Sequence, residues 1–221
     1  MGYRTLGIMG AGGLAREVLE LAQIINSREK RWDNFVFIDL HSSDEKVNGI
    51  SVCDYDQAKS LYAESGLEAI VGIGEPKKRE TLFGDLERDG IPAATLIHPD
   101  VHIPATTSVG KGVVIQYGCF ISCNVSLGDY VYIQPQCNIG HDDVIGEGCM
   151  IAGFGNVAGK VHIGKWTYVG LSTAVREAAN IGEYSVIGMG SVVQRDIPYR
   201  VIAMGNPARP FLRNEGGKIL R

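Results

Sequence analysis

The stretch NIGHDDVIG places three consecutive titratable residues, His141, Asp142 and Asp143, among apolar, glycine and asparagine residues. A histidine side chain gains and loses protons near neutral pH, so it can take a proton from a reacting group and return it. A local cluster of charge on a regular apolar background therefore marks a candidate functional site. The alternative for this cluster is a calcium site or a salt bridge that only decorates the surface.

A second candidate site lies near the N-terminus, where Gly10, Gly12 and Ala15 satisfy the pattern G-x-G-x-x-G/A between a predicted strand and a predicted helix. Such a turn lets a phosphate approach backbone N–H groups at the positive end of the helix dipole. Asp39 ends the second predicted strand, where its carboxylate could accept a hydrogen bond from a ribose hydroxyl. The turn can also be purely structural. The presence of Asp39 at the position expected for an acidic residue of this motif favours nucleotide binding.

The elements that must position the histidine cluster follow a six-residue repeat. A branched aliphatic residue occupies every sixth position from Ile97 to Val193, seventeen in all. This period fits neither a helix nor a simple amphipathic strand, and it is typical of a parallel β-solenoid built from hexapeptide repeats. Three hexads per coil predict a little over five coils, whose aliphatic residues stack into one core. Small or β-branched residues four positions after the aliphatic one, including three cysteines, are predicted to fill the interior.

Glycine often follows the aliphatic residue of the hexad, as at Gly110, Gly128 and Gly140. We attribute these glycines to sharp corners that need freedom in φ.

The chain before the repeat alternates predicted strands and helices, which favours a small parallel α/β sheet. We therefore predict two domains, residues 1–96 and residues 97–221. Only three or four strands precede the repeat, whereas a dinucleotide fold uses about six, so one nucleotide fits the first domain better than NAD does. The predicted strands cover residues 4–10, 34–39, 69–74 and 93–98, and the predicted helices cover residues 14–26 and 75–90.

Composition excludes several classes of partner. The 221 residues carry a formal net charge of -4 and show no basic stripe, so nucleic acid and anionic membranes are poor candidates. No apolar run approaches the ~20 residues that span a bilayer, and we expect a cytoplasmic protein. The five cysteines form no CxxC pair, which indicates reduced thiols that act as small core residues.

With these motifs identified, the chain resembles a known family. The hexapeptide column, GHDDVIG, IGMGSVV and the closing GNPAR are similar to the left-handed β-helix acyltransferases. The front half, with GAGGLARE, FID and GIGEPKKR, resembles the sialic acid O-acetyltransferases and the N-acetyltransferases of nucleotide-linked 4-amino-4,6-dideoxyhexoses. The left-handed coiling is implied by this resemblance, because the spacing alone does not fix the hand.

The resemblance also implies a homotrimer with acetyl-CoA as co-substrate in the groove between two β-helices, and no metal. It assigns the general base to His141 and its acidic partner to Asp142. It implies that the first domain binds the nucleotide-linked sugar through Gly10, Ala11, Gly12, Gly13, Asp39, Leu40 and Gly74. It places the acetyl-CoA contacts at Met150, Gly159, Leu171, Gly188, Met189, Gly205, Asn206, Pro207 and Arg209.

Two positions depart from the family pattern. Many relatives carry a second histidine near the acetyl group, where this chain has Met150, so a backbone N–H would have to stabilise the oxyanion. Asp143 stands where relatives prefer a small residue, and the sequence gives no account of it.

The predicted function is transfer of an acetyl group from acetyl-CoA to the amine of a nucleotide-linked amino-dideoxy sugar, for surface polysaccharide biosynthesis. Transfer is direct, with His141 as general base. A sugar O-acetyltransferase uses the same base and is the nearest alternative. A zinc carbonic anhydrase of β-helix type needs a third histidine beyond His141 and His162. A nucleotide-binding trimer without turnover is the remaining alternative.

Overall fold

The computed structural model describes residues 4–39, 45–62 and 66–215. The chain divides into two compact units, of which the first contains residues 1–74 and 81–96 and the second contains residues 75–80 and 97–221.

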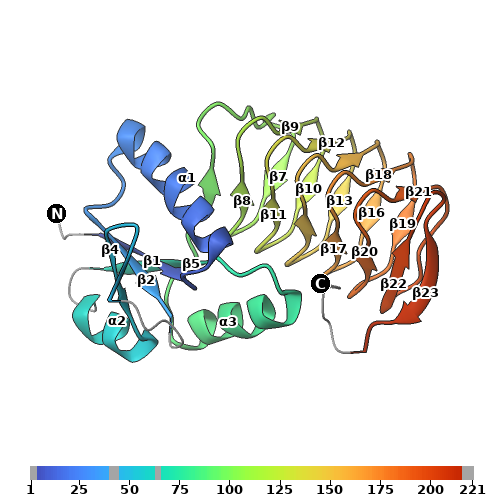
Figure 1. The fold of residues 1–221 in the computed structure, drawn as a ribbon. Coiled ribbons are helices and arrows are strands. Elements are labelled where there is room, and N and C mark those ends of the chain that lie inside the picture. The colour runs from blue at the N-terminus through green and yellow to red at the C-terminus, as the bar shows by residue number, and fades with distance from the viewer. Residues whose placement is uncertain (1–3, 40–44, 63–65, 216–221) are drawn as a thin grey trace. The chain divides into compact units, whose positions relative to one another are not determined.

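The first unit is built on a five-stranded sheet in the order β3-β4-β2-β1-β5 (Figure 1). All neighbouring strands are parallel except β3 and β4, which form an antiparallel pair. The strands are β1 (Thr5–Met9), β2 (Asn34–Ile38), β3 (Lys46–Val47), β4 (Ile50–Cys53) and β5 (Leu67–Val71). The helices are α1 (Gly13–Glu29), α2 (Tyr55–Tyr62) and α3 (Pro76–Arg88), of which the start of α3, up to residue 80, is assigned to the second unit.

The predicted parallel α/β sheet is confirmed, with two differences. The sequence analysis missed β3, β4 and α2, because these short elements lack a clear apolar period. The predicted strand at residues 93–98 is wrong as a member of this sheet: residue Ala93 forms only an isolated bridge with Ala69. Its end, β6 (Leu96–Ile97), joins the first coil of the repeat instead, because the hexad pattern begins at Ile97.

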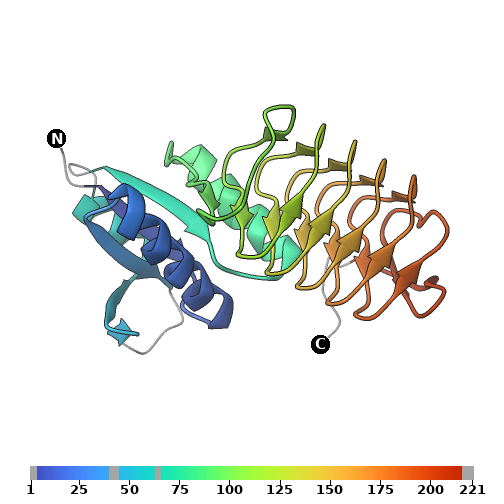
Figure 2. The same ribbon diagram turned by 90° about the horizontal axis from the view of Figure 1, so that it is seen from above.

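The second unit is a parallel β-helix with three faces (Figure 2). The β7 face contains β7 (Ser108–Val109), β10 (Ser126–Leu127), β13 (Val144–Ile145), β16 (His162–Ile163) and β19 (Asn180–Ile181). The β9 face contains β9 (Phe120–Ile121), β12 (Asn138–Ile139), β15 (Asn156–Val157), β18 (Ala174–Val175) and β21 (Val192–Val193). The eight-stranded face contains β6, β8 (Val114–Ile115), β11 (Tyr132–Ile133), β14 (Met150–Ile151), β17 (Tyr168–Val169), β20 (Val186–Ile187), β22 (Val201–Met204) and β23 (Arg209–Arg213).

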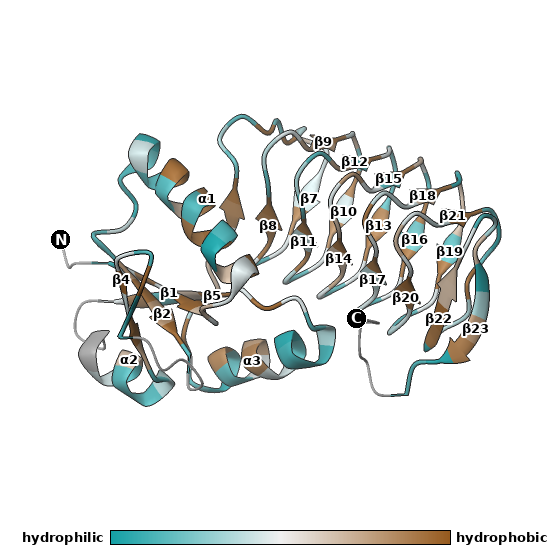
Figure 3. Cartoon of the chain, viewed as in Figure 1, coloured by the Kyte–Doolittle hydropathy of each residue, from teal (hydrophilic) through white to brown (hydrophobic). Residues whose placement is uncertain are grey.

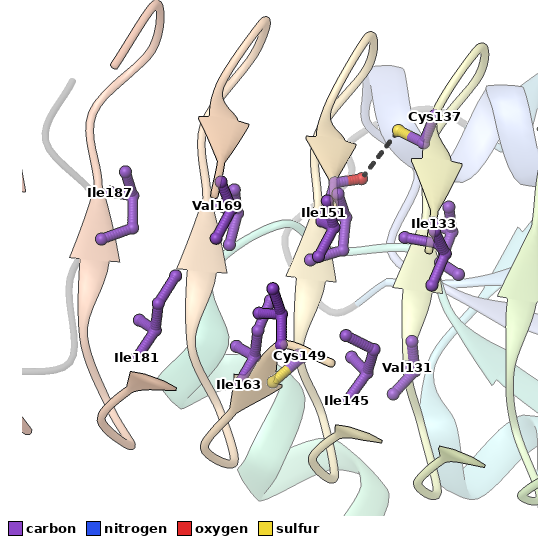
Figure 4. Close-up of a cluster of buried hydrophobic side chains, with 14 of the residues drawn as sticks. Val131, Ile133, Cys137, Ile145, Cys149, Ile151, Ile163, Val169, Ile181 and Ile187 are labelled. Carbon is purple, nitrogen blue, oxygen red and sulfur yellow. Dashed lines mark hydrogen bonds between the residues drawn. The ribbon is translucent and has the colours of Figure 1, made fainter. Parts of the chain in front are cut away.

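The core of the β-helix is the predicted aliphatic column. Paired residues of neighbouring coils are 18 positions apart, as Asn124 and Asp142 are, so three hexads make one coil. Ile133 and Ile151 stack in one row and Ile145, Ile163 and Ile181 in another, all at most 1% exposed (Figure 4). Burial of each such side chain contributes roughly 1.5–3 kcal/mol, which allows strands of only two residues to persist.

The outward residues differ between faces. Figure 3 shows β8, β14 and β20 of the eight-stranded face as apolar, and their outward side chains Val114, Met150 and Val186 are buried. Outward residues of the β7 face, such as Ser126 and His162, are exposed.

The glycines that follow the aliphatic residue have a different cause from the one predicted. None of them adopts a positive φ; the left-handed conformation falls two residues later, for example at Asp142 (φ 61°) and Lys160 (φ 61°). A Cβ at Gly128 would lie 2.7 Å from the backbone nitrogen of Glu147, and one at Gly140 would lie 2.5 Å from the carbonyl carbon of Ala158. These glycines therefore allow neighbouring coils to approach, and the prediction that they free φ is wrong.

Candidate functional site

His141 lies on the turn between β12 and β13, where the β9 face meets the β7 face. Its side chain is 49% exposed, and its Nδ1 lies 2.8 Å from Oδ2 of Asp142. A carboxylate at this distance favours the tautomer with the proton on Nδ1, which leaves the lone pair on Nε2. The imidazole is therefore oriented on one side and able to accept a proton on the other.

Asn124 holds Asp142 from the preceding coil. Its Nδ2 donates a hydrogen bond of 3.0 Å to Oδ1 of Asp142. The hydrogen bond from His141 and, second, the one from Asn124 lower the pKa of Asp142. The sequence analysis missed Asn124, although its position 18 residues before Asp142 would have placed it on the same corner of the neighbouring coil.

Gly159 supports the His141 ring from the following coil. A Cβ at Gly159 would lie 2.5 Å from Nε2 and 2.6 Å from Cε1 of His141, so only glycine leaves room for the imidazole in this orientation. The N–H of Gly159 donates no hydrogen bond within the described part of the chain, whereas its carbonyl oxygen accepts one from Ala178. The histidine turn and the turn of the following coil thus bring together an imidazole, a carboxylate and a backbone N–H without a partner among the described residues.

Asp143 points into the prism. Its side chain is fully buried, and its Oδ1 accepts a hydrogen bond of 2.8 Å from the N–H of Val161. Its Oδ2 has no hydrogen-bond partner among the described residues. Burial raises the pKa of Asp143 to about 7, against the opposing effect of the Val161 N–H.

The other residues predicted to contact acetyl-CoA lie elsewhere on the prism. Leu171, Gly188 and Met189 occupy the turns that join the eight-stranded face to the β9 face, and Met189 is 76% exposed. We call these turns, residues 116–119, 134–137, 152–155, 170–173 and 188–191, the apolar corner. The turns with His141 and Gly159, residues 122–125, 140–143, 158–161 and 176–179, form the histidine corner. The β9 face separates the two corners within one chain.

The C-terminal group of predicted contacts continues from the apolar corner. Gly205 donates its N–H to Oγ of Ser191 at 3.1 Å, and the turn from Gly205 to Arg209 connects β22 with β23. Asn206 and Arg209 are exposed, and Pro207 is partly buried. Met150 is 3% exposed on the eight-stranded face and lies with neither group.

The predicted nucleotide turn lies at the carboxyl end of the first unit's sheet. Gly10 directly follows β1 and has φ 99°, Gly12 is the N-cap of α1, Gly13 begins that helix and Gly74 follows β5. Oδ2 of Asp39 accepts a hydrogen bond of 3.0 Å from the N–H of Ala11, so the two predicted parts of the site touch. Leu40 lies outside the described residues.

The third position of the glycine pattern has a packing role. A Cβ at Gly72 would lie 2.6 Å from Cα of Ala15, so small residues at both positions let α1 approach β5. The first turn of α1 contains no acidic residue, which leaves the positive end of the helix dipole uncompensated by its own side chains.

The cysteines fit the prediction only in part. Cys119, Cys137 and Cys149 are buried in the core, whereas Cys53 is intermediate and Cys123 is exposed. Cys123 is a corner residue 18 positions before His141, so the prediction that it fills the core is wrong. Among the described residues, no three His, Cys, Asp or Glu side chains are grouped to hold a metal ion. The helices in that part of the chain are too short or too polar to cross a lipid bilayer.

Known proteins resemble both units. Residues 5–86 match the family described as the PglD N-terminal domain. The chain superimposes on PerB from Caulobacter crescentus, solved in complex with CoA and GDP-perosamine, with a TM-score of 0.84, 28% identity and coverage of 94% of this chain and 97% of PerB. It also superimposes on the acetyltransferase domain of PglB from Neisseria gonorrhoeae, solved with acetyl coenzyme A, with a TM-score of 0.87, 26% identity and coverage of 95% and 100%.

The chain is therefore similar over nearly its whole length to solved sugar-acetyltransferase structures, and its first unit matches their N-terminal domain family. These likenesses confirm the resemblance and the fold class predicted from the sequence. A curated relative, the GDP-perosamine N-acetyltransferase of Escherichia coli O157:H7, is 28% identical over 126 residues. The matched region spans 56% of this chain and only 56% of that relative.

Proposed function

We propose that the chain is an acetyl-CoA-dependent N-acetyltransferase that acetylates the amine of a nucleotide-linked amino-dideoxy sugar for surface glycan biosynthesis. The observation that carries this proposal is the exposed imidazole of His141, oriented by Asp142 and resting on Gly159. The likeness to PerB, solved with CoA and GDP-perosamine, supports the two substrates.

His141 acts as the general base. An amine that attacks the thioester carbonyl of acetyl-CoA becomes cationic, and the tetrahedral species reverts unless a base removes the proton. Nε2 of His141 accepts that proton, because Nδ1 is held by Asp142. Asp142 fixes the ring and stabilises its cation, while Asn124 keeps Asp142 in place. General base catalysis of this kind contributes roughly 10²- to 10⁴-fold.

Gly159 supplies the oxyanion donor in this proposal. Its free N–H lies on the turn beneath the His141 ring, so base and donor reach the same small volume. A preorganised N–H stabilises the negative charge that develops on the thioester oxygen. The N–H thereby replaces the side chain that many relatives have where this chain has Met150.

A complete site requires a second copy of the chain. The histidine corner and the apolar corner lie at opposite edges of the β9 face, which supports a site in which one acetyl-CoA molecule contacts two copies. Contact between the histidine corner of one copy and the apolar corner of another would do so. Tyr117, Phe154 and Leu171 of the apolar corner are 52%, 59% and 44% exposed, and they provide an apolar surface for this contact. The threefold form implied by the resemblance arranges three such pairs.

The first unit binds the nucleotide part of the acceptor in this proposal. The turn from Gly10 to Gly13 presents backbone N–H groups at the start of α1, and Asp39 stabilises that turn through Ala11. Phosphate groups suit the uncompensated dipole of α1. The two relatives named for GDP-perosamine make a GDP-linked 4-amino sugar the first acceptor to test.

The test is a screen for thiol release from acetyl-CoA with GDP-, UDP- and dTDP-linked 4-amino-4,6-dideoxyhexoses, with product mass as the second readout. We expect CoA release and a mass gain of one acetyl group with one of these amines. Release with only a hydroxyl sugar supports the O-acetyltransferase alternative. Failure with every amino-sugar acceptor and every hydroxyl-sugar acceptor contradicts the proposed function.

A further inference from the structure

Asp143 is a buried carboxyl group that the proposed mechanism does not use. It lies beside Asp142 on the histidine turn, its side chain is fully buried, and its Oδ1 accepts the Val161 N–H at 2.8 Å. Oδ2 has no hydrogen-bond partner among the described residues. An unpaired buried carboxyl oxygen is costly, so its presence calls for a physical reason.

The hydrogen bond to the next coil does not require a carboxyl group. At the same position in other hexads, hydroxyl groups accept the N–H of the following coil: Oγ1 of Thr107 from Val125 at 3.2 Å, and Oγ of Ser185 from Val201 at 3.2 Å. A threonine would therefore join the two turns at lower desolvation cost. What Asp143 adds to this hydrogen bond is the capacity for negative charge.

We propose that Asp143 is a second acidic positioning residue of the His141 site, which joins the histidine turn to the Gly159 turn and stabilises the imidazolium form of His141 from inside the prism. This inference rests on the proposed function. Its geometric basis is the turn that begins with Ala158 and Gly159 and ends with Val161. The hydrogen bond from the Val161 N–H to Asp143 holds this turn, and Gly159 of the same turn lies against the imidazole ring.

The charges around Asp143 are few. On its own turn, His141 attracts the ionised carboxyl group and Asp142 repels it. On the following coil, Lys160 forms an ion pair of 3.2 Å with Glu177, and on the preceding coil the exposed Cys123 is the titratable group. Burial raises the pKa of Asp143 to about 7, which supports the inference because the group changes charge in the range in which a histidine base works.

The test compares Asp143→Asn and Asp143→Thr with the wild type. Both variants retain an acceptor for the Val161 N–H and lose the charge. We expect roughly 3- to 10-fold lower kcat, unchanged KM for both substrates, and an acid limb of the kcat/KM profile displaced to lower pH, because imidazolium loses a stabilising charge.

Thr167→Val is the matched control. It removes the acceptor for the Ser185 N–H, which lies 3.4 Å from Oγ1 of Thr167, at a position of the repeat distant in sequence from His141. It should lower Tm without displacing the pH profile.

NMR titration of the His141 ring in the free protein separates this inference from the proposed function. With signals assigned by a His141→Gln variant, the ring should titrate at lower pH in Asp143→Asn than in the wild type. Wild-type kcat and an unchanged pH profile in both charge-free variants overturn the inference, as does an undisplaced ring titration. A displaced titration without turnover of any acceptor in the wild type overturns the proposed function and leaves the electrostatic role of Asp143 standing.

Discussion

At the scale of the residue, the imidazole of His141 owes its setting to three successive coils. Asn124 from one coil holds Asp142, Asp142 orients the ring, and Gly159 from the next coil leaves space for it. The adjacency of His141 and Asp142 is visible in the sequence, so this pair could be predicted directly. Asn124 would have required the 18-residue coil period to be applied to polar residues as well as to the core. The burial of Asp143 could not be predicted from residue types alone, because its position in the hexad usually holds a small side chain.

Asp143 makes a prediction about stability. Its pKa is raised from 3.8 to about 7 by burial, so the folded chain retains a proton that the unfolded chain loses. The wild type must therefore lose stability as pH rises from about 4 to about 7, by at most about 4 kcal/mol. Asp143→Asn lacks this titratable group and has no such loss. The difference between the free energies of unfolding of Asp143→Asn and the wild type should therefore shift in favour of the variant as pH rises from about 4 to about 7. Urea denaturation of both proteins at about pH 4.5 and about pH 8 measures the change, and a difference independent of pH would contradict it.

At the scale of the element, the hexad explains why strands of two residues form and stack. The aliphatic column was predictable, because the period of six has one architectural interpretation and every member from Ile115 to Val193 is buried. The function of the corner glycines was not predictable from the pattern, because close approach between coils and positive φ both favour glycine. The structure separates the two: close approach falls directly after the aliphatic residue, and positive φ falls two residues later. The short β3, β4 and α2 carry too little periodicity to predict.

Two glycine substitutions test this separation. A Cβ at Gly128 would lie 2.7 Å from the backbone nitrogen of Glu147, whereas a Cβ at Gly190 would have no atom within 4 Å although φ there is 67°. Gly128→Ala should therefore force two coils apart and cost several kcal/mol, while Gly190→Ala should cost only about 1 kcal/mol. Chemical denaturation of the two variants makes the comparison. Equal losses would mean that the turn conformation, and not coil spacing, selects both glycines.

At the scale of the whole molecule, the predicted acetyl-CoA contacts other than Met150 fall into two groups, one at each of two corners of the prism that one chain keeps apart. The resemblance could assign these residues but not their separation, which depends on the three-faced coil. His141 and Gly159 occupy one corner and Leu171 and Met189 the other. The exposed apolar side chains of the second corner are the type of surface that a neighbouring copy covers. This arrangement supports the proposal that the active site is shared between copies.

Subunit complementation tests the shared site. His141→Ala removes the proposed base from the histidine corner, and Met189→Glu places a negative charge at the apolar corner, where acetyl-CoA is proposed to bind. Each homo-oligomer should be inactive, whereas mixed oligomers contain some sites with an intact histidine corner from one copy and an intact apolar corner from the other. Co-expression with two affinity tags should therefore restore part of the wild-type activity. Inactive mixed oligomers of normal size would place both corners of each site on one chain.

The central claim is that His141 removes the proton from the attacking amine, and the most direct measurement is steady-state acetyl transfer by His141→Asn with an acceptor that the wild type turns over. Asparagine keeps a polar side chain on Gly159 but cannot accept the proton. The account predicts a loss of kcat of roughly 10²- to 10⁴-fold with nearly unchanged KM for both substrates and an unchanged oligomer. Turnover within about tenfold of the wild type would contradict it.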